Sequence, residues 1–474
     1  MTHIRPSWPH GARRGPSLVR AAVTAIVATA LIGTPLAHAQ QGDSKGKGLP
    51  VLRDAEIEQL LRDYSSPVLR AAGLSRQNIQ VVIINDTTFN AFVADGRRIF
   101  INQGALWQSK TPNQVIGVLA HEAGHIAGGH LSKMREQMAR AQTQMIVAML
   151  LGAGAIAAGS RSGSGVGQAG MAAMSAPQEV IRRTLLSYAR QQEENADRAA
   201  VKFLNATGQS AKGMYQTFRR FADEGLFATH GADPYVQSHP MAAERVAGLE
   251  RLAHASPNWD KEDSPALQLR HDLMRAKIAG FTQRPDAVRR AYPGSDQSLP
   301  AQYARAISTY RHGDLRAAVA MVDALIRAQP NNPYFHELKG QALLEGGRPA
   351  EAIAPLRRAS QLSGRAPLIE ILLGQALVAS SNPAYAEEAI TILRNALVRE
   401  PEMAIGYVQL AMAYSRKGAY AEADLASAQA ALLRGDNKTA RDLATRAKSR
   451  FAVGSPGWVR ADDIVSTKPG KSNN

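Results

Sequence analysis

The sequence predicts an α+β domain in residues 40–260, followed by an all-α superhelix in residues 261–457. Short β-branched runs among long helical patterns predict the first region. An alanine-rich helical pattern that repeats every 34 residues predicts the second. The chain has 474 residues, of which 45% are hydrophobic and 20% charged, so it has ample material for two or three globular domains.

Charge and cysteine content narrow the functional classes. The net charge is +16, which is compatible with nucleic acid, an anionic membrane surface or acidic partners. No nucleic-acid motif and no basic stretch interleaved with aromatic residues is present, so we expect no nucleic-acid partner. The chain has no cysteine, which excludes disulfides and restricts metal ligands to histidine, aspartate and glutamate.

Residues 1–39 have the pattern of a secretory signal peptide. Four arginines and no acidic residue precede an apolar run at 21–36, which ends at the small-residue site Ala37-His38-Ala39. A transmembrane anchor is the weaker alternative, because Gly33-Thr34-Pro35 interrupts a run that is already short. We therefore expect cleavage after Ala39 and a periplasmic protein.

The first domain is predicted to begin with a helix and a small sheet. A helix is expected at 54–72 and a strand at 79–85. Two further strands flank an Asp95-Gly96 turn and predict a hairpin, at 89–93 and 98–102. An edge strand here could pair with an extended peptide, or it could be plain sheet with no role in substrate binding.

The next helix carries His121-Glu122-Ala123-Gly124-His125, which matches H-E-x-x-H. Residues i and i+4 share a helix face, so the two imidazoles can bind one Zn²⁺ while Glu122 reaches a water on it. Pro112 suits the first turn, and Thr111 with Gln114 predicts a capping box. Since the motif also arises by chance, a third ligand is needed.

A weakly charged segment follows the motif helix. Residues 141–160 contain no charged residue, and 145–158 are strongly apolar. A Gly/Ser-rich stretch then runs from Arg161 to Pro177. This segment could be a lid over the cleft, a hairpin that dips into a membrane, or a mobile loop. A peripheral membrane contact is therefore among the expected interactions.

A second long helix is expected at 177–205. It carries Glu193 and Asp197, four residues apart and on one face with the small residues Ala196 and Ala200, so another helix can approach closely. Glu193 would be the third ligand, and Asp197 would hold a ligand histidine in its tautomer. An exposed acidic face is the alternative, and Glu194 is the competing ligand.

Three further polar residues were considered. His130 lies one residue early for H-E-x-x-H-x-x-G-x-x-H, so it is expected at a helix end rather than on the metal. His239 and Arg245 follow a turn-like stretch and could reach the cleft.

Together these motifs resemble the HtpX-like gluzincin metallopeptidases, over roughly residues 50–255. The resemblance implies a zincin-type fold with one Zn²⁺ per subunit, held by His121, His125 and Glu193, and Glu122 as the catalytic base. It also implies a substrate-binding strand at Asn90-Ala91-Phe92. Integral-membrane members carry clear spanning helices, which this chain lacks.

Two roles remain open for the residues after position 238. Arg245 or His239 could stabilise the oxyanion. Alternatively, His239 could be a fourth metal ligand that acts as a gate by displacing the catalytic water.

The C-terminal half has the spacing of tetratricopeptide repeats. Gly313 and Gly347 are 34 residues apart, as are Ala318 and Ala352. An unrelated helical bundle is the alternative. Residues 458–474 are polar and are expected to form a disordered tail.

The combined pattern predicts a periplasmic zinc endopeptidase of outer-membrane protein assembly and quality control. Expected partners are unfolded or misassembled outer-membrane proteins as substrates, and the assembly machinery through the repeats. The alternative is a non-enzymatic chaperone or scaffold that acts through the repeats.

Overall fold

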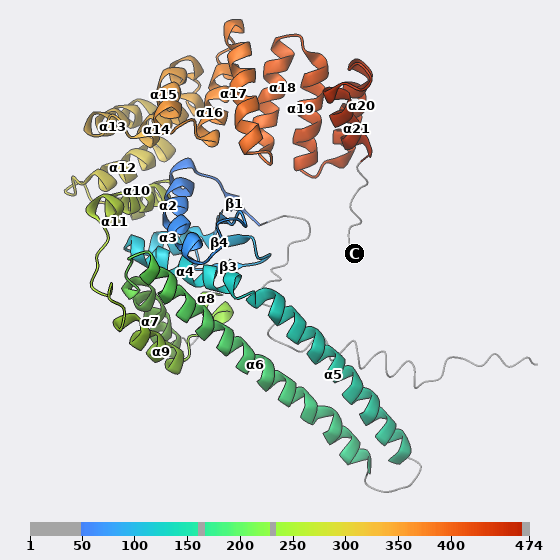
Figure 1. Cartoon of the computed structure of the whole chain (residues 1–474). Coiled ribbons are helices and arrows are strands. Elements are labelled where there is room, and N and C mark those ends of the chain that lie inside the picture. Colours follow the sequence, from blue (N-terminus) through green and yellow to red (C-terminus); the bar gives the residue numbers. More distant parts are fainter. Residues whose placement is uncertain (1–48, 160–165, 228–233, 467–474) are drawn as a thin grey trace, which may run out of the picture. The chain divides into compact units, whose positions relative to one another are not determined.

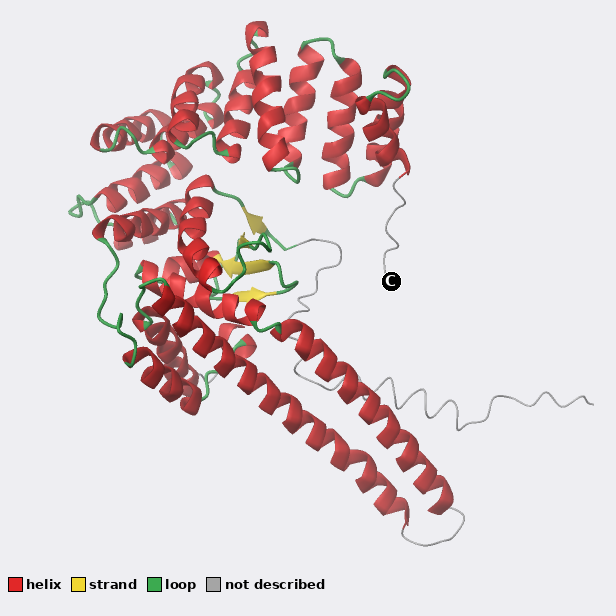
Figure 2. Ribbon diagram, viewed as in Figure 1, coloured by secondary structure: helices red, strands yellow, loops and turns green. Residues whose placement is uncertain are grey.

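The computed structural model describes residues 49–159, 166–227 and 234–466. Helices dominate, and one small sheet lies in the first domain (Figure 2). The predicted signal peptide lies outside the described residues. None of the helices in the described part is long and apolar enough to cross a membrane.

The four-stranded sheet has the order β1-β2-β4-β3. The β2–β4 pair is parallel, and the other two pairs are antiparallel. The predicted strand and hairpin are confirmed, and β3 lies at one edge. The strands are β1 (Val51–Leu52), β2 (Gln80–Ile84), β3 (Ala91–Val93) and β4 (Arg98–Asn102).

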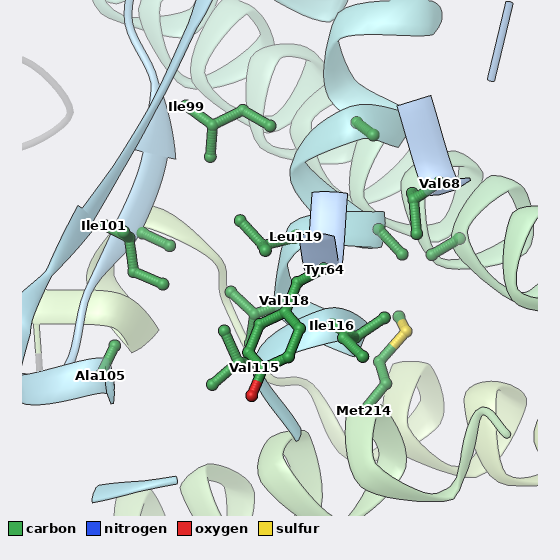
Figure 3. Packing of buried hydrophobic residues seen from close by; sticks show 14 of the residues in the cluster. Tyr64, Val68, Ile99, Ile101, Ala105, Val115, Ile116, Val118, Leu119 and Met214 are labelled. Atoms are coloured by element: carbon green, nitrogen blue, oxygen red, sulfur yellow. The ribbon is translucent and has the colours of Figure 1, made fainter. Parts of the chain in front are cut away.

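Helices cover this sheet and form the core of the domain. Apolar residues of β4 and of the metal-motif helix pack together with Tyr64, Val68 and Met214 (Figure 3). The helices are α2 (Ala55–Ala71), α3 (Gln103–Gln108), α4 (Pro112–Ala127), α5 (His130–Gly159), α6 (Val166–Ala206), α7 (Lys212–Phe227), α8 (Pro234–Ser238) and α9 (Ala243–His254).

The start of α4 differs from the predicted capping box. Thr111 is the N-cap residue but its side chain accepts no capping hydrogen bond. Instead, Asp263 Oδ2 accepts the Asn113 N–H at 2.9 Å, and Gln114 Oε1 accepts the Lys110 N–H at 2.6 Å. A residue 150 positions away satisfies the free N–H, which no local pattern could reveal.

The segment after α4 forms two long helices, α5 and α6, which lie side by side as a helical hairpin (Figure 1). The second helix begins at Val166 rather than near Pro177. Its first turns contain many glycines and small residues, so the sequence alone favoured a loop. Packing against α5 supplies the stability that their intrinsic helix propensity lacks.

The C-terminal half consists of antiparallel helix pairs. Buried alanines recur at the repeat spacing, at Ala318, Ala352, Ala389 and Ala423, where one helix approaches the next. The predicted order, an α+β domain and then an all-α repeat region, is confirmed. The helices are α10 (Pro265–Thr282), α11 (Pro285–Ala291), α12 (Leu299–His312), α13 (Leu315–Ala328), α14 (Pro333–Glu345), α15 (Pro349–Leu362), α16 (Pro367–Ala379), η1 (Pro383–Tyr385), α17 (Ala386–Arg399), α18 (Ala404–Arg416), α19 (Tyr420–Leu433) and α20 (Asn437–Arg450).

The expected disordered tail from residue 458 is wrong for its first part. Residues Pro456–Ser466 form α21, in which Ala461 and Ile464 are buried. The Ser455 hydroxyl accepts the Trp458 N–H at 3.3 Å and so caps the helix. Apolar residues three positions apart outweigh the polar composition that suggested disorder.

Candidate metal centre

Two helices bring the motif histidines and the acidic residues together. α4 carries His121 and His125, and α6 carries Glu193. The helices approach closely at Gly124, where an added Cβ would lie 2.8 Å from the carbonyl oxygen of Ala196. The small residues predicted to permit this contact therefore do so, and a side chain at Gly124 would push the ligands apart.

The three predicted ligands lie at distances suited to one small cation. His121 Nε2 lies 3.0 Å from His125 Nε2 and 3.3 Å from Glu193 Oε2. His125 Nε2 lies 3.3 Å from Glu193 Oε1. Ligands about 2.0–2.1 Å from a tetrahedral Zn²⁺ are roughly 3.3 Å from one another. The donor set and its spacing therefore fit zinc.

His239 supplies a fourth donor to the same cluster. Its Nδ1 lies 3.3 Å from His121 Nε2 and 3.1 Å from Glu193 Oε2. One ligand atom from each of His121, His125, Glu193 and His239 lies within 4.8 Å of the others. His239 Nε2 is also 3.3 Å from the carbonyl oxygen of Ala91 on the edge strand β3. His239 thus occupies both the fourth corner of the site and the adjacent strand edge.

Glu122 points into this centre and is fully buried. Among the described residues, neither of its carboxylate oxygens accepts a hydrogen bond, although His239 Nε2 lies 3.5 Å from Oε1. A buried carboxylate without donors is costly unless water or a ligand completes its environment. This arrangement suits a group that accepts a proton from water beside the metal.

Asp197 and Arg245 hold the ligands from behind. Asp197 Oδ1 lies 2.9 Å from His121 Nδ1, the nitrogen opposite the metal-facing one. Arg245 donates to both Asp197 oxygens, at 2.7 and 2.9 Å, and its third nitrogen lies 2.9 Å from Glu193 Oε2. The predicted role of Asp197 in fixing a tautomer fits this geometry.

The same contacts disfavour the expected oxyanion role of Arg245. Its Nη1 also donates to the Pro240 carbonyl at 3.1 Å, so the guanidinium faces carboxylates and backbone. Arg245 is better described as a positioning residue for Glu193 and Asp197.

Electrostatics keep the two carboxylates ionised. Burial by itself would raise the pKa of Glu193, but the charges of His239 and Arg245 outweigh it and hold this pKa well below its ordinary value. Burial is likewise outweighed at Asp197, whose pKa is lowered chiefly by Arg245. Both groups are therefore ready to bind or orient a cation.

The two ligand histidines differ in their protonation. Burial lowers the pKa of His125. Burial also acts to lower the pKa of His121, but the Asp197 and Glu193 carboxylates reverse this and raise it to about 9. A bound cation would replace the proton that His121 holds without metal.

The competing residues lie elsewhere. Glu194 is on the exposed side of α6, where it pairs with Arg198 at 3.0 Å. His130 is the first residue of α5, and its Nδ1 lies 3.0 Å from His125 Nδ1, on the side away from the other ligands. It therefore contacts a ligand instead of the metal position, as expected.

The predicted substrate strand runs beside the centre. Ala91 is fully buried and lies in β3, where its carbonyl faces His239. Phe92 stacks on Phe100 of β4, with ring centroids 5.2 Å apart. Asn90 precedes the strand, and its backbone carbonyl accepts the Asn102 N–H at 2.9 Å. Asn90 and Phe92 therefore shape the hairpin, while Ala91 is the one in contact with the centre.

The sequence did not single out Tyr235. It is fully buried on α8, and its ring lies 4.8 Å from that of His239 and 5.4 Å from that of Phe221. His239 N–H donates to the Tyr235 carbonyl at 2.8 Å. An aromatic residue four positions before a candidate ligand histidine was the available signal.

Residues 52–253 match the model of peptidase family M48, and residues 303–367 match that of a tetratricopeptide repeat. With the donor cluster, these matches define a metallopeptidase, a hydrolase whose peptidase domain precedes a repeat region.

The chain is 23% identical over 420 residues to the beta-barrel assembly-enhancing protease of Yersinia pestis, covering 87% of this chain and 83% of that protein. The protein of the same name from Escherichia coli K12 gives the same identity and coverage. A putative protein of that name from Vibrio cholerae is 24% identical over 292 residues, covering 60% of this chain and 58% of that protein. The resemblance predicted from the motifs is confirmed.

Among solved structures, MamA matches with a TM-score of 0.28 and 20% identity over 34% of this chain and 90% of that chain, too low a score to define a shared fold.

Proposed function

We propose that the chain is a zinc-dependent endopeptidase of the periplasm that acts on outer-membrane proteins during assembly. The carrying observation is the cluster of His121, His125 and Glu193 beside the unpartnered carboxylate of Glu122. Zinc in this cluster would polarise a scissile carbonyl and lower the pKa of water. A structural zinc site is normally closed by four protein ligands and needs no free carboxylate.

The residues of the chain then have distinct tasks. Glu122 accepts the proton of the attacking water and passes it to the leaving amine. Asp197 holds His121 through Nδ1, and Arg245 holds both Asp197 and Glu193. The edge of β3 offers backbone groups that can pair with an extended peptide.

His239 keeps the enzyme latent in this proposal. Its ring lies where water and the peptide backbone would otherwise approach, against Glu193 and the Ala91 carbonyl. Activity therefore requires α8 and His239 to move. A protease that meets unfolded proteins needs such a restraint.

The cellular assignment rests on the predicted signal peptide, the repeats and the printed name of the relatives. Unfolded or misassembled outer-membrane proteins are the proposed substrates. The repeats would contact the assembly machinery, since stacked helix pairs expose an extended surface for protein partners.

Metal content of two neighbouring variants tests the ligand set. The purified chain should hold one zinc ion per subunit, and Glu193→Ala should lose most of it, because two histidines alone bind zinc far more weakly than three ligands. Glu194→Ala is the matched control on the same helix and should retain zinc and casein cleavage. Zinc retention in Glu193→Ala would overturn the proposed site.

A further inference from the structure

The hairpin of α5 and α6 changes character along its length. The base of α5 carries Lys133, Arg135, Glu136 and Arg140 within its first three turns. From residue 141 to residue 159 the same helix has no charged side chain. A helix that packs on a single neighbour leaves much of its surface to solvent, and that surface is normally charged or polar. The distal half of α5 lacks this feature.

Large apolar side chains are exposed where the charges end. Ile146, Val147 and Leu150 of α5 are 54, 50 and 63% exposed, and Val180 of α6 is 63% exposed. They gather on one structural unit, unlike scattered single apolar residues, which are common on soluble proteins. This exposed apolar group, Ile146, Val147, Leu150 and Val180, is called the hairpin patch below.

The charges that flank the hairpin patch are mostly positive. Between residues 140 and 183 the sequence contains four arginines and one glutamate: Arg140, Arg161, Arg182, Arg183 and Glu179. Basic residues that border an apolar surface match the combination of anionic headgroups and acyl chains at a membrane interface. A second protein surface would need acidic residues around an apolar centre to match this pattern.

We propose that the hairpin patch docks on the surface of an anionic phospholipid bilayer. The contact is interfacial, because none of the described helices has the length and hydropathy of a membrane span. Ile146, Val147 and Leu150 enter the boundary between headgroups and acyl chains, and the flanking arginines face the headgroups.

Docking would set the distance of the metal centre from the membrane. Ile146 and Leu150 lie 16 and 20 residues after His130, the residue that contacts the ligand His125. At 1.5 Å per residue, the helix spans about 24–30 Å between them. The peptidase site is therefore held above the lipid surface, within reach of a polypeptide chain that emerges there. The docking itself does not depend on peptidase activity.

Vesicle flotation tests the proposal with the chain that lacks residues 1–39. Vesicles of phosphatidylcholine and phosphatidylglycerol should carry the protein upward, and vesicles of phosphatidylcholine alone should carry much less. The Ile146→Asp/Leu150→Asp double variant should partition at least about tenfold more weakly into the mixed vesicles, because two apolar contacts are lost.

The control variant places the same charges on exposed valines of the repeat region. Val398 and Val453 are 82 and 84% exposed, so Val398→Asp/Val453→Asp adds two negative charges without touching the hairpin patch. It should float like the unchanged chain. Circular dichroism and zinc content should be the same for all three proteins, which separates a docking defect from misfolding.

Three results would overturn the proposal. The first is failure of the unchanged chain to float with anionic vesicles. The second is equal flotation of the two double variants. The third is self-association, seen by sedimentation velocity, that Ile146→Asp/Leu150→Asp abolishes while flotation is unaffected, since a second copy of the chain would then cover the hairpin patch.

Discussion

Opposite charges are balanced around the metal centre at the scale of single residues. Glu193 and Asp197 are both buried, and Arg245, also buried, lies between them. Removing one partner of such a group leaves an uncompensated buried charge, which typically costs about 3–5 kcal/mol. Arg245 therefore supports the carboxylates that hold His121, and the donor spacing depends on it.

The His239→Ala variant should cleave casein faster than the unchanged chain while it keeps one zinc per subunit. The reason is that His239 occupies the fourth donor position and contacts the Ala91 carbonyl, so its removal admits water and peptide. Initial rates measured at equal zinc content check this prediction.

His254→Ala provides the matched control for that variant. His254 stacks on Trp259 with ring centroids 3.9 Å apart and is not one of the clustered donors. Its replacement should leave the rate unchanged. If His239→Ala instead lowers kcat by roughly a hundredfold with zinc retained, His239 is a transition-state donor and the gate is wrong.

At the scale of elements, sequence predicted best what local spacing encodes. The i and i+4 histidines of α4, the Asp95-Gly96 hairpin and the repeat period all follow from short-range geometry. The link between Glu193 and the histidines spans 68 residues from His125, so it required the resemblance as well as the small face of α6.

The failures have a common physical cause. The start of α6, the cap of α4 and the helix α21 all depend on residues that pack or donate from elsewhere in the fold. His239 was placed near the cleft by sequence, but its contact with Ala91 and the ring of Tyr235 could be known only from the structure.

Helix α10 carries a buried histidine that should make stability depend on pH. His271 Nε2 donates to the Ser109 carbonyl at 2.9 Å, and Nδ1 accepts from Tyr64 Oη at 3.1 Å. Burial, which outweighs the hydrogen bond to Ser109, lowers the pKa of His271 to about 4. In the unfolded chain the pKa of histidine is about 6.5.

The unfolded chain therefore binds a proton that the folded chain excludes as pH falls from about 6.5 towards 4. This contribution to stability is present above pH 6.5 and is lost over that range, by about 2 kcal/mol between pH 7 and pH 4.5. Urea unfolding with EDTA present should show a loss smaller by about this amount for His271→Gln, whose amide keeps one donor and one acceptor. The exposed His312→Gln is the control, and equal pH dependence of both variants would contradict the account.

At the scale of the whole molecule, a buried ion network joins the peptidase domain to the repeat region. Lys277 Nζ of α10 lies 2.8 Å from Asp54 Oδ2, 3.2 Å from Glu56 Oε2 and 3.8 Å from Glu337 Oε2 of α14. Tyr303 of α12 donates to Glu56 at 3.0 Å. Since these groups compensate one another only in this arrangement, the first residues of the peptidase domain and the first repeats depend on each other for folding.

The central claim is that this chain is a peptidase whose base is Glu122. The Glu122→Gln variant tests it most directly, because the amide has nearly the same shape but cannot accept the proton of water at neutral pH. We expect this variant to fold, to hold one zinc ion per subunit and to lose casein cleavage. Cleavage at the rate of the unchanged chain would exclude Glu122 as the base, and absence of cleavage by both proteins after His239→Ala is introduced would favour a scaffold that acts through the repeats.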